Sequence, residues 1–245
     1  MIAALIPARG GSKRLPRKNV LPFAGVPLIV HSIAAARAVG RIDRILVSTD
    51  DTEIAEIAAQ ACGEVIVRPA ELAHDHATTG SAVRHALGVA YAGRVLPTCV
   101  VTLQPNCPLR PAQLVADAIE LFLAKAPDSV VSVTSSHRKH GTIDDGLFVP
   151  EYRTGMRSQD MQPRYYENGV VYVSRSNLVM AREDLFGERI LPLITDPLYA
   201  LGDIDTALDF QVAEYLYHAH SERFEHAAET LIERIRRIAK IEEMA

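Results

Sequence analysis

The chain has 245 residues, of which 48% are hydrophobic and 23% charged, the composition of an ordinary globular protein. Its 26 basic and 30 acidic side chains leave a net charge of −4, which argues against a nucleic-acid partner. The sequence contains no stretch of about 18 apolar residues, the length that spans a membrane, and its apolar N-terminal run is too short for a signal peptide. We therefore expect a cytoplasmic protein.

Short apolar runs alternate with helical patterns from residue 2 to residue 133. The predicted strands are Ile2–Ile6, Arg44–Ser48, Glu64–Val67, Cys99–Leu103 and Ser129–Val133, and the predicted helices are Pro27–Val39, Asp51–Ala61, Ser81–Tyr91 and Pro111–Lys125. This alternation predicts an α/β fold with a mostly parallel, doubly wound, Rossmann-like sheet. Ligands of such sheets bind at the carboxyl ends of the strands.

The alternation stops at residues 135–168, which are polar, rich in turn-forming residues and without periodicity. A connection of that length is either functional or an insertion with a small structure of its own. Its aromatic residues are of the type favoured at interfaces. The predicted elements that follow are strands Gly169–Ser174 and Arg189–Thr195 and helices Asp205–His218 and Glu222–Met244. We therefore expect a single domain over residues 1–245 with an insertion at 135–168.

The first predicted strand ends at a basic loop. Five cations and no acid lie within residues 9–18, namely Arg9, Lys13, Arg14, Arg17 and Lys18. The adjacent Gly10 and Gly11 allow backbone N–H groups to turn toward an anion. The glycine spacing fits neither a Walker A loop nor the Rossmann fingerprint. The loop therefore predicts a polyphosphate site of another type, the alternative being a solvated basic turn.

Two carboxylates lie close together near the C-terminus, at Asp203 and Asp205. In an extended segment, residues two apart point to the same face, so both could approach one cation. Mg²⁺ favours one or two protein carboxylates together with phosphate oxygens. The alternative is that Asp205 is the N-cap of the following helix and Asp203 a turn residue.

The three cysteines, at 62, 99 and 107, do not have the spacing of a zinc site.

These motifs, taken together and in this order, resemble the N-acylneuraminate cytidylyltransferases, also called CMP-sialic acid synthetases. The stretches that carry the resemblance are Leu5–Asn19, Val47–Asp50, Arg68–Leu72, Leu103–Arg110, Asn168-Gly169 and Asp203–Thr206. Two stretches depart from the family: Asn106-Cys107 replaces the usual Thr-Ser, and Arg164–Glu167 differs from the usual form. Both departures lie on the sugar side, so they bear on the identity of the sugar.

The resemblance implies that CMP is transferred from CTP to the anomeric hydroxyl of a nonulosonic, sialic-acid-type keto sugar acid, with release of pyrophosphate. The reaction would need Mg²⁺, for which Mn²⁺ could substitute, and the protein would be a homodimer built by residues 135–168. The implied CTP-binding residues are Arg9, Gly10, Gly11, Ser12, Lys13, Lys18, Asn19, Arg68 and Thr79. The implied sugar-binding residues are Gln104, Asn168, Gly169, Lys139 and Arg157, with the last two reaching over the partner's site. Asp203 and Asp205 would hold the metal, and Arg9, Lys18 and Asp205 would be catalytic.

Three alternatives remain open at this stage. The same reaction could use the eight-carbon acid KDO, or pseudaminic or legionaminic acid. A glycosyltransferase could use Asp203 and Asp205 as its metal-binding DxD motif, although the basic loop after the first strand argues against it. A non-catalytic nucleotide-binding protein would not need both the cation loop and the carboxylate pair.

Overall fold

A seven-stranded sheet forms the centre of the computed structural model, which describes residues 1–61, 64–224 and 227–242. Within these residues the strand order is β11-β7-β10-β6-β1-β4-β5. Strand β10 runs antiparallel to β6 and β7, and the other neighbours are parallel. The strands are β1 Ile2–Pro7, β4 Arg44–Thr49, β5 Glu64–Val67, β6 Cys99–Thr102, β7 Ser129–Ser136, β10 Arg164–Arg175 and β11 Ile190–Ile194. The predicted mostly parallel α/β sheet is confirmed.

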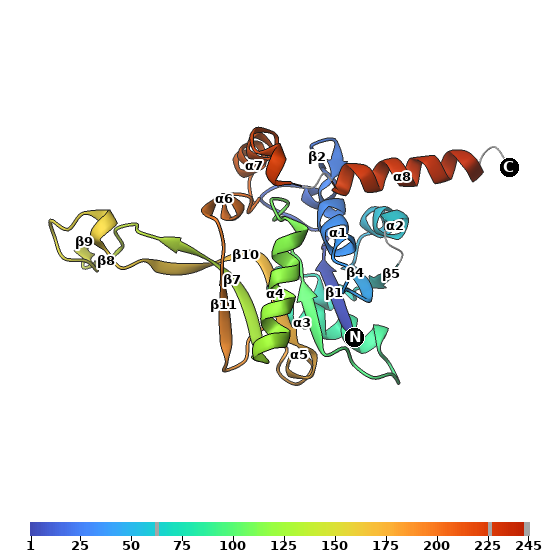
Figure 1. Cartoon of the computed structure of the whole chain (residues 1–245), viewed down its shortest axis with the longest axis horizontal. Coiled ribbons are helices and arrows are strands. Elements are labelled where there is room, and N and C mark those ends of the chain that lie inside the picture. The colour runs from blue at the N-terminus through green and yellow to red at the C-terminus, as the bar shows by residue number, and fades with distance from the viewer. Residues whose placement is uncertain (62–63, 225–226, 243–245) are drawn as a thin grey trace.

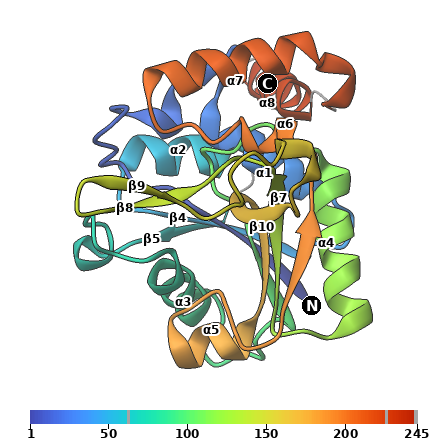
Figure 2. The same ribbon diagram turned by 90° about the vertical axis from the view of Figure 1, so that its left-hand side faces the viewer.

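Helices cover both faces of the sheet (Figures 1 and 2). One face carries α1 Leu28–Ala38, α2 Thr52–Ala61, α4 Ala112–Lys125 and the start of α8 Ala227–Glu242, and the other carries α3 Thr79–Ala90 and α5 Ser176–Arg182. The central strand β1 shows why both faces are apolar. Its side chains alternate, with Ala4 and Ile6 in one core and Ala3 and Leu5 in the other.

A third apolar cluster lies beyond the carboxyl ends of the strands. It contains Phe23, Leu109, Ile204 and Tyr217, which are all buried. Its elements are the two-residue strands β2 Pro22–Phe23 and β3 Val26–Pro27, with α6 Pro197–Ala200 and α7 Ala207–Ala219. This cluster places the start of α7, and with it the Asp203–Asp205 segment, beside the basic loop.

Residues 135–168 form an arm that projects away from the sheet (Figure 1). At its base β7 and β10 continue as a pair, from Val133↔Glu167 to Ser136↔Arg164. Beyond them a hairpin is formed by β8 Gly141–Asp144 and β9 Leu147–Pro150. Its two-residue turn, Asp145 and Gly146, has φ values of 47° and 77°, as a type I′ hairpin turn requires. The segment predicted as aperiodic is therefore an ordered hairpin on a two-stranded stalk.

Several boundaries differ from the predictions. Strand β10 begins at Arg164 rather than at Gly169, because its first residues pair with β7 in the arm. Helix α8 begins at Ala227 rather than at Glu222. The predicted end of that helix at Met244, and Cys62, lie outside the described residues. The sequence did not predict β2, β3, α5, α6 or the short 3₁₀ turns at Lys18–Val20, Ala70–Leu72, Ser158–Asp160 and Ser221–Arg223.

Candidate active site

A cavity of about 280 Å³ opens at the carboxyl ends of β1 and β6, where ligands of such sheets bind. Polar residues dominate its wall. The residues that line it are Pro7, Arg9, Ser12, Lys13, Arg14, Leu15, Lys18, Asn19, Arg68, Asp75, Ala77, Thr78, Thr79, Ala82, Gln104, Pro105, Asn106 and Asp205. The structure thus brings to one cavity most of the residues that the resemblance assigned to CTP.

The two glycines of the basic loop shape the cavity without lining it. The N–H of Gly10 donates to Asp50 Oδ1 over 3.0 Å. A Cβ at Gly10 would lie 2.6 Å from Asp51 Oδ2, so only glycine lets the loop pack this closely on the end of β4. Asn19 closes the loop by donating to the backbone oxygen of Arg9 over 2.9 Å. In this structure the Gly10 N–H therefore points to Asp50, and a phosphate would have to displace that carboxylate to accept it.

Asp75 pairs with two cations of the basic loop. Its Oδ1 lies 3.0 Å from Arg9 Nη1, and its other carboxylate oxygen pairs with Lys13. These hydrogen bonds, first from Lys13 and then from Arg9, lower the pKa of the Asp75 carboxyl. A phosphate that binds Arg9 and Lys13 would compete with this carboxylate. Asp75 was not among the site residues predicted from the sequence, because an acid in a loop gives no local sign of pairing with distant cations.

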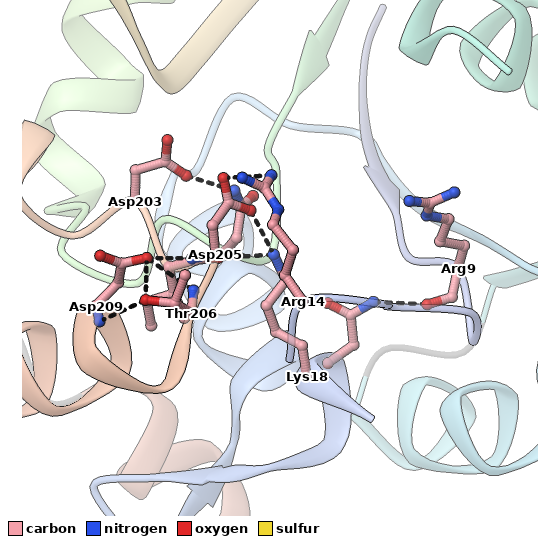
Figure 3. Close-up of polar contacts among 10 residues, drawn as sticks. Arg9, Arg14, Lys18, Asp203, Asp205, Thr206 and Asp209 are labelled. Carbon is pink, nitrogen blue, oxygen red and sulfur yellow. Dashed lines mark hydrogen bonds and ion pairs between the residues drawn. The ribbon is translucent and has the colours of Figure 1, made fainter. Parts of the chain in front are cut away.

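Asp205 pairs with two further cations, Arg14 and Lys18 (Figure 3). Arg14 Nη2 lies 2.7 Å from Asp205 Oδ2, and Lys18 Nζ lies 3.1 Å from Asp205 Oδ1. Lys18 also donates to the backbone oxygen of Ile204 over 2.6 Å. Lys18 therefore joins the basic loop to the segment that carries the carboxylates. Arg17, the fifth cation, instead pairs with Asp51 and Glu53 outside the cavity.

The N-cap of α7 is Thr206 and not Asp205. The Thr206 hydroxyl accepts from the Asp209 N–H over 3.2 Å, and Asp209 Oδ2 accepts from the Thr206 N–H over 2.7 Å. The same Oδ2 accepts from the Asp205 N–H over 3.1 Å. This capping box satisfies the first turn of the helix without the Asp205 side chain. The alternative interpretation of Asp205 as an N-cap is therefore wrong, and Asp209 is occupied by capping.

The two carboxylates at positions 203 and 205 flank the fully buried Ile204, as expected for an extended segment. The pKa of Asp203 is raised, first because neighbouring atoms partly desolvate its carboxyl although it still reaches solvent, and second because of the charge on Asp205. Asn106 Nδ2 donates to Asp203 Oδ1 over 2.6 Å. The carboxylates are thus close enough to repel each other, and a divalent cation would relieve that repulsion.

The donor set fits Mg²⁺ or Mn²⁺ held jointly with phosphate. No cluster of three or more His, Cys, Asp or Glu side chains within the described ranges could hold a metal alone. Two carboxylates beside a cationic phosphate site are the usual protein share of a nucleotide-bound Mg²⁺. Asp203 and Asp205 are therefore the residues that could hold the ion.

Arg68 lines the cavity and is held in place by Ser48 of β4. It is buried, with Nε donating to Ser48 Oγ over 3.1 Å and Nη2 to the Ser48 backbone oxygen over 2.7 Å. Burial lowers its pKa. Thr79 is the first residue of α3, whose N-cap hydroxyl on Thr78 accepts from the Ser81 N–H over 3.0 Å. Arg68 and Thr79 therefore both line the cavity, the first bonded to β4 and the second at the start of α3.

Residues 3–245 match the family model described as cytidylyltransferase. The chain belongs to this family. It is 33% identical over 228 residues to the CMP-N,N'-diacetyllegionaminic acid synthase of Legionella pneumophila, covering 90% of this chain and 98% of that one. It is 30% identical over 225 residues to the pseudaminic acid cytidylyltransferase of Campylobacter jejuni, covering 89% and 97%. The predicted resemblance is confirmed, and the protein is a nucleotidyltransferase.

Other relatives are longer, or share the fold alone. The N-acylneuraminate cytidylyltransferase of Streptococcus agalactiae is 33% identical over 214 residues, which are 84% of this chain and 51% of that protein. The chain thus spans about half the length of that relative. The solved CMP:2-keto-3-deoxy-manno-octonic acid synthetase, complexed with CTP, superposes with a TM-score of 0.68 at 16% identity, over 89% of this chain and 98% of that one. The 4-diphosphocytidyl-2C-methyl-D-erythritol synthase of Anaerococcus prevotii gives a TM-score of 0.62 at 18% identity, over 88% and 95%.

On the predicted sugar side of the cytidylyltransferase, Gln104 lines the cavity and Gly169 lies behind it. Gly169 has φ of 73°, and a Cβ there would be 3.3 Å from Cys107 Sγ and 4.0 Å from Gln104 Oε1. The Asn168 side chain is buried among strands. Its Nδ2 donates to Thr134 and Thr195 hydroxyls over 2.8 and 2.7 Å, and its Oδ1 accepts from Ser132 over 2.6 Å. Asn168 therefore holds β10 in place, and its side chain does not line the cavity.

Lys139 and Arg157 lie in the arm and do not line the cavity of the cytidylyltransferase. Lys139 Nζ sits 5.3 Å above the centre of the Tyr152 ring, and Arg157 Nε donates to Asp160 over 2.7 Å. No helix in the described part of the chain is long and apolar enough to cross a membrane.

Proposed function

We propose that this cytidylyltransferase transfers CMP from CTP to the anomeric 2-hydroxyl of a nonulosonic, sialic-acid-type keto sugar acid and releases pyrophosphate. The observation that carries the proposal is the contact between two motifs far apart in sequence. The cations Arg14 and Lys18 of the basic loop meet the carboxylate Asp205 in one cavity at the ends of parallel strands. We place the reaction in the cytoplasm, where CTP is available.

The basic loop would hold the triphosphate. Arg9, Lys13 and Lys18 would offset negative charge on the α-phosphoryl group and on the leaving pyrophosphate, which is the main catalytic requirement of phosphoryl transfer. The oxygen of the sugar 2-hydroxyl bonds to the α-phosphorus and releases its proton to solvent. At the same time the bond between that phosphorus and the oxygen bridging to the β-phosphate breaks, and its electron pair leaves with pyrophosphate. Asn19, Arg68 and Thr79 would hold the cytidine.

Asp203 and Asp205 would hold Mg²⁺, or Mn²⁺ in its place. When bound, the ion supplies positive charge to phosphate oxygens. The Asp205→Asn variant tests this role, because Asn keeps the size of the side chain and Thr206 keeps the helix cap. Arg14 is 69% exposed and Lys18 keeps its bond to the Ile204 backbone oxygen, so we expect a small change in melting temperature but a loss of about 10²-fold or more in kcat. A variant with full activity at low Mg²⁺ would refute the metal site.

The proposed sugar substrate is a nine-carbon keto acid. The three sequence relatives named above are named for legionaminic, pseudaminic and N-acylneuraminic acids, which are all nine-carbon keto sugar acids. In this chain Asn106 and Cys107 stand beside Gln104 and Gly169 in the predicted sugar pocket. Burial raises the pKa of the Cys107 thiol to about 12, so this cysteine shapes the pocket and is not a nucleophile.

We further propose that the arm, residues 135–168, is a dimerisation element within a single domain. Its hairpin exposes Ile143, Leu147 and Phe148, which are 71%, 70% and 54% exposed. Such large apolar side chains gathered on a projecting hairpin favour burial against a second copy. In that dimer Lys139 and Arg157 would contribute cations to the partner's sugar pocket.

A panel assay tests the reaction as a whole. The enzyme is incubated with Mg²⁺, one of the four nucleoside triphosphates, and one of several keto sugar acids, and pyrophosphate release is measured. We expect release with CTP and a nine-carbon acid, and little with UTP, ATP or GTP, because a site that hydrogen-bonds a base rejects analogues that leave its groups unpaired. Equal release with UTP would refute the cytidine assignment, and preference for KDO would refute the nonulosonic one.

A further inference from the structure

Asn106 joins the loop after β6 to the Asp203–Asp205 segment by two hydrogen bonds. Its Nδ2 donates to Asp203 Oδ1 over 2.6 Å, and its backbone oxygen accepts from the Ile204 N–H over 2.8 Å. The same two segments also pack closely, since a Cβ at Gly202 would lie 2.7 Å from Leu109 Cγ. The loop and the carboxylate segment therefore form one packed unit.

The two carboxylates of this segment are held in different ways. Asp205 is paired with two cations, Arg14 and Lys18. The Asp203 side chain, as far as the described residues go, has Asn106 as its hydrogen-bond partner and no ion pair. Its position thus depends on one neutral amide.

A neutral donor suits a metal ligand better than a cation would. An amide N–H fixes the direction of a carboxylate without cancelling its charge, and it leaves other lone pairs free for an ion. A lysine or arginine at this position would compete with the metal for the same oxygens. Partners that orient metal ligands in this way typically change metal affinity by about 10–100-fold when removed.

We propose that Asn106 is a positioning residue that holds Asp203 in place for the divalent cation. The inference rests on the proposed metal role of Asp203 and adds a residue to it. Threonine, the usual residue at this position in the family that the sequence resembles, carries its hydroxyl on Cβ and reaches one bond less far than the asparagine amide. With this backbone, asparagine is the residue that spans the distance to Asp203.

Metal binding without turnover provides the test. Mn²⁺ is titrated into enzyme with CTP and no sugar acid, and binding is followed by water-proton relaxation for wild type, Asn106→Ala, Asn106→Thr and Asp203→Ala. We expect Asn106→Ala to weaken Mn²⁺ binding about 10-fold or more, Asn106→Thr to fall between it and wild type, and Asp203→Ala to be the weakest. Thermal unfolding checks that each variant is folded.

Gln113→Ala is the matched control, because Gln113 Nε2 donates to Asp117 Oδ1 over 2.8 Å on the surface of α4, and neither residue lines the cavity. It removes the same kind of bond and should leave Mn²⁺ binding unchanged. If Asp203→Ala weakens Mn²⁺ binding but Asn106→Ala does not, the positioning role is wrong and the metal site stands. If Asp203→Ala also binds Mn²⁺ normally, the metal site is wrong and the inference falls with it.

Discussion

Replacing Lys18 with methionine should remove most of the activity and a measurable part of the stability. Lys18 Nζ donates to the Ile204 backbone oxygen over 2.6 Å and lies 3.1 Å from Asp205 Oδ1, and its side chain is only 14% exposed. A hydrogen bond that involves a charged group contributes about 1.5–3 kcal/mol. A loss of 1 kcal/mol lowers the melting temperature of a chain of this size by about 2–4 °C. We therefore expect the melting temperature to fall by about 3–12 °C.

The effect on catalysis should be larger than the effect on folding. Methionine keeps the apolar stem of Lys18 but removes the charge that we propose contacts the phosphates, which should lower kcat/KM by about 10²-fold or more. The assay measures pyrophosphate release at a temperature well below the melting transition, with thermal unfolding recorded on the same samples. Lys125→Met is the control, because Lys125 is an exposed lysine at the end of α4. A Lys18→Met enzyme with near-normal turnover would refute the phosphate role and favour a solvated basic turn.

Three further outcomes are expected. Gly80→Ala should lower the melting temperature, because its Cβ would lie 2.0 Å from the backbone oxygen of Glu183, and a normal melting curve would contradict this packing. Burial lowers the pKa of His31 below 6.5, so the unfolded chain takes up a proton that the folded chain does not, and stability should fall as pH drops below 6.5. Denaturant midpoints at pH 7.5 and 5.5 should therefore differ more in wild type than in His31→Gln, and equal differences would exclude His31 as the cause. Phe148→Asp should convert the proposed dimer to the mass of one chain in light scattering, and a single-chain mass for the wild type would contradict the dimer.

The body of the fold could be predicted because its strands and helices are apolar with clear periods. The arm could not be predicted in the same way, because both faces of its strands are exposed and its sequence has no apolar alternation. Its Asp145-Gly146 pair was nevertheless a hairpin signal in the sequence. The extension of β10 back to Arg164 depends on pairing with Ser136, a contact that no local pattern predicts.

For the candidate site, residue types were easier to predict than contacts. The basic loop and Asp205 do meet in one cavity, as the family resemblance implied. The direction of each side chain depends on long-range partners: Arg17 turns to Asp51, and Asp75 reaches the basic loop across 66 residues of sequence. The resemblance assigned Asn168 to the sugar, but no local pattern showed that its side chain is buried and bonded to residues of neighbouring strands.

Ion pairs inside the cavity change how the protein should respond to ionic strength. Four cations of the basic loop already pair with Asp75 and Asp205. When a triphosphate binds here, its phosphate groups replace the carboxylates of Asp75 and Asp205 as partners of these cations. Binding therefore does not neutralise four unpaired charges. Because salt screens the internal pairs as well as those with phosphate, the two effects partly cancel. The KM for CTP should therefore rise with salt less steeply than the number of cations suggests, and the carboxylates would keep nucleotide affinity steady when the salt concentration varies.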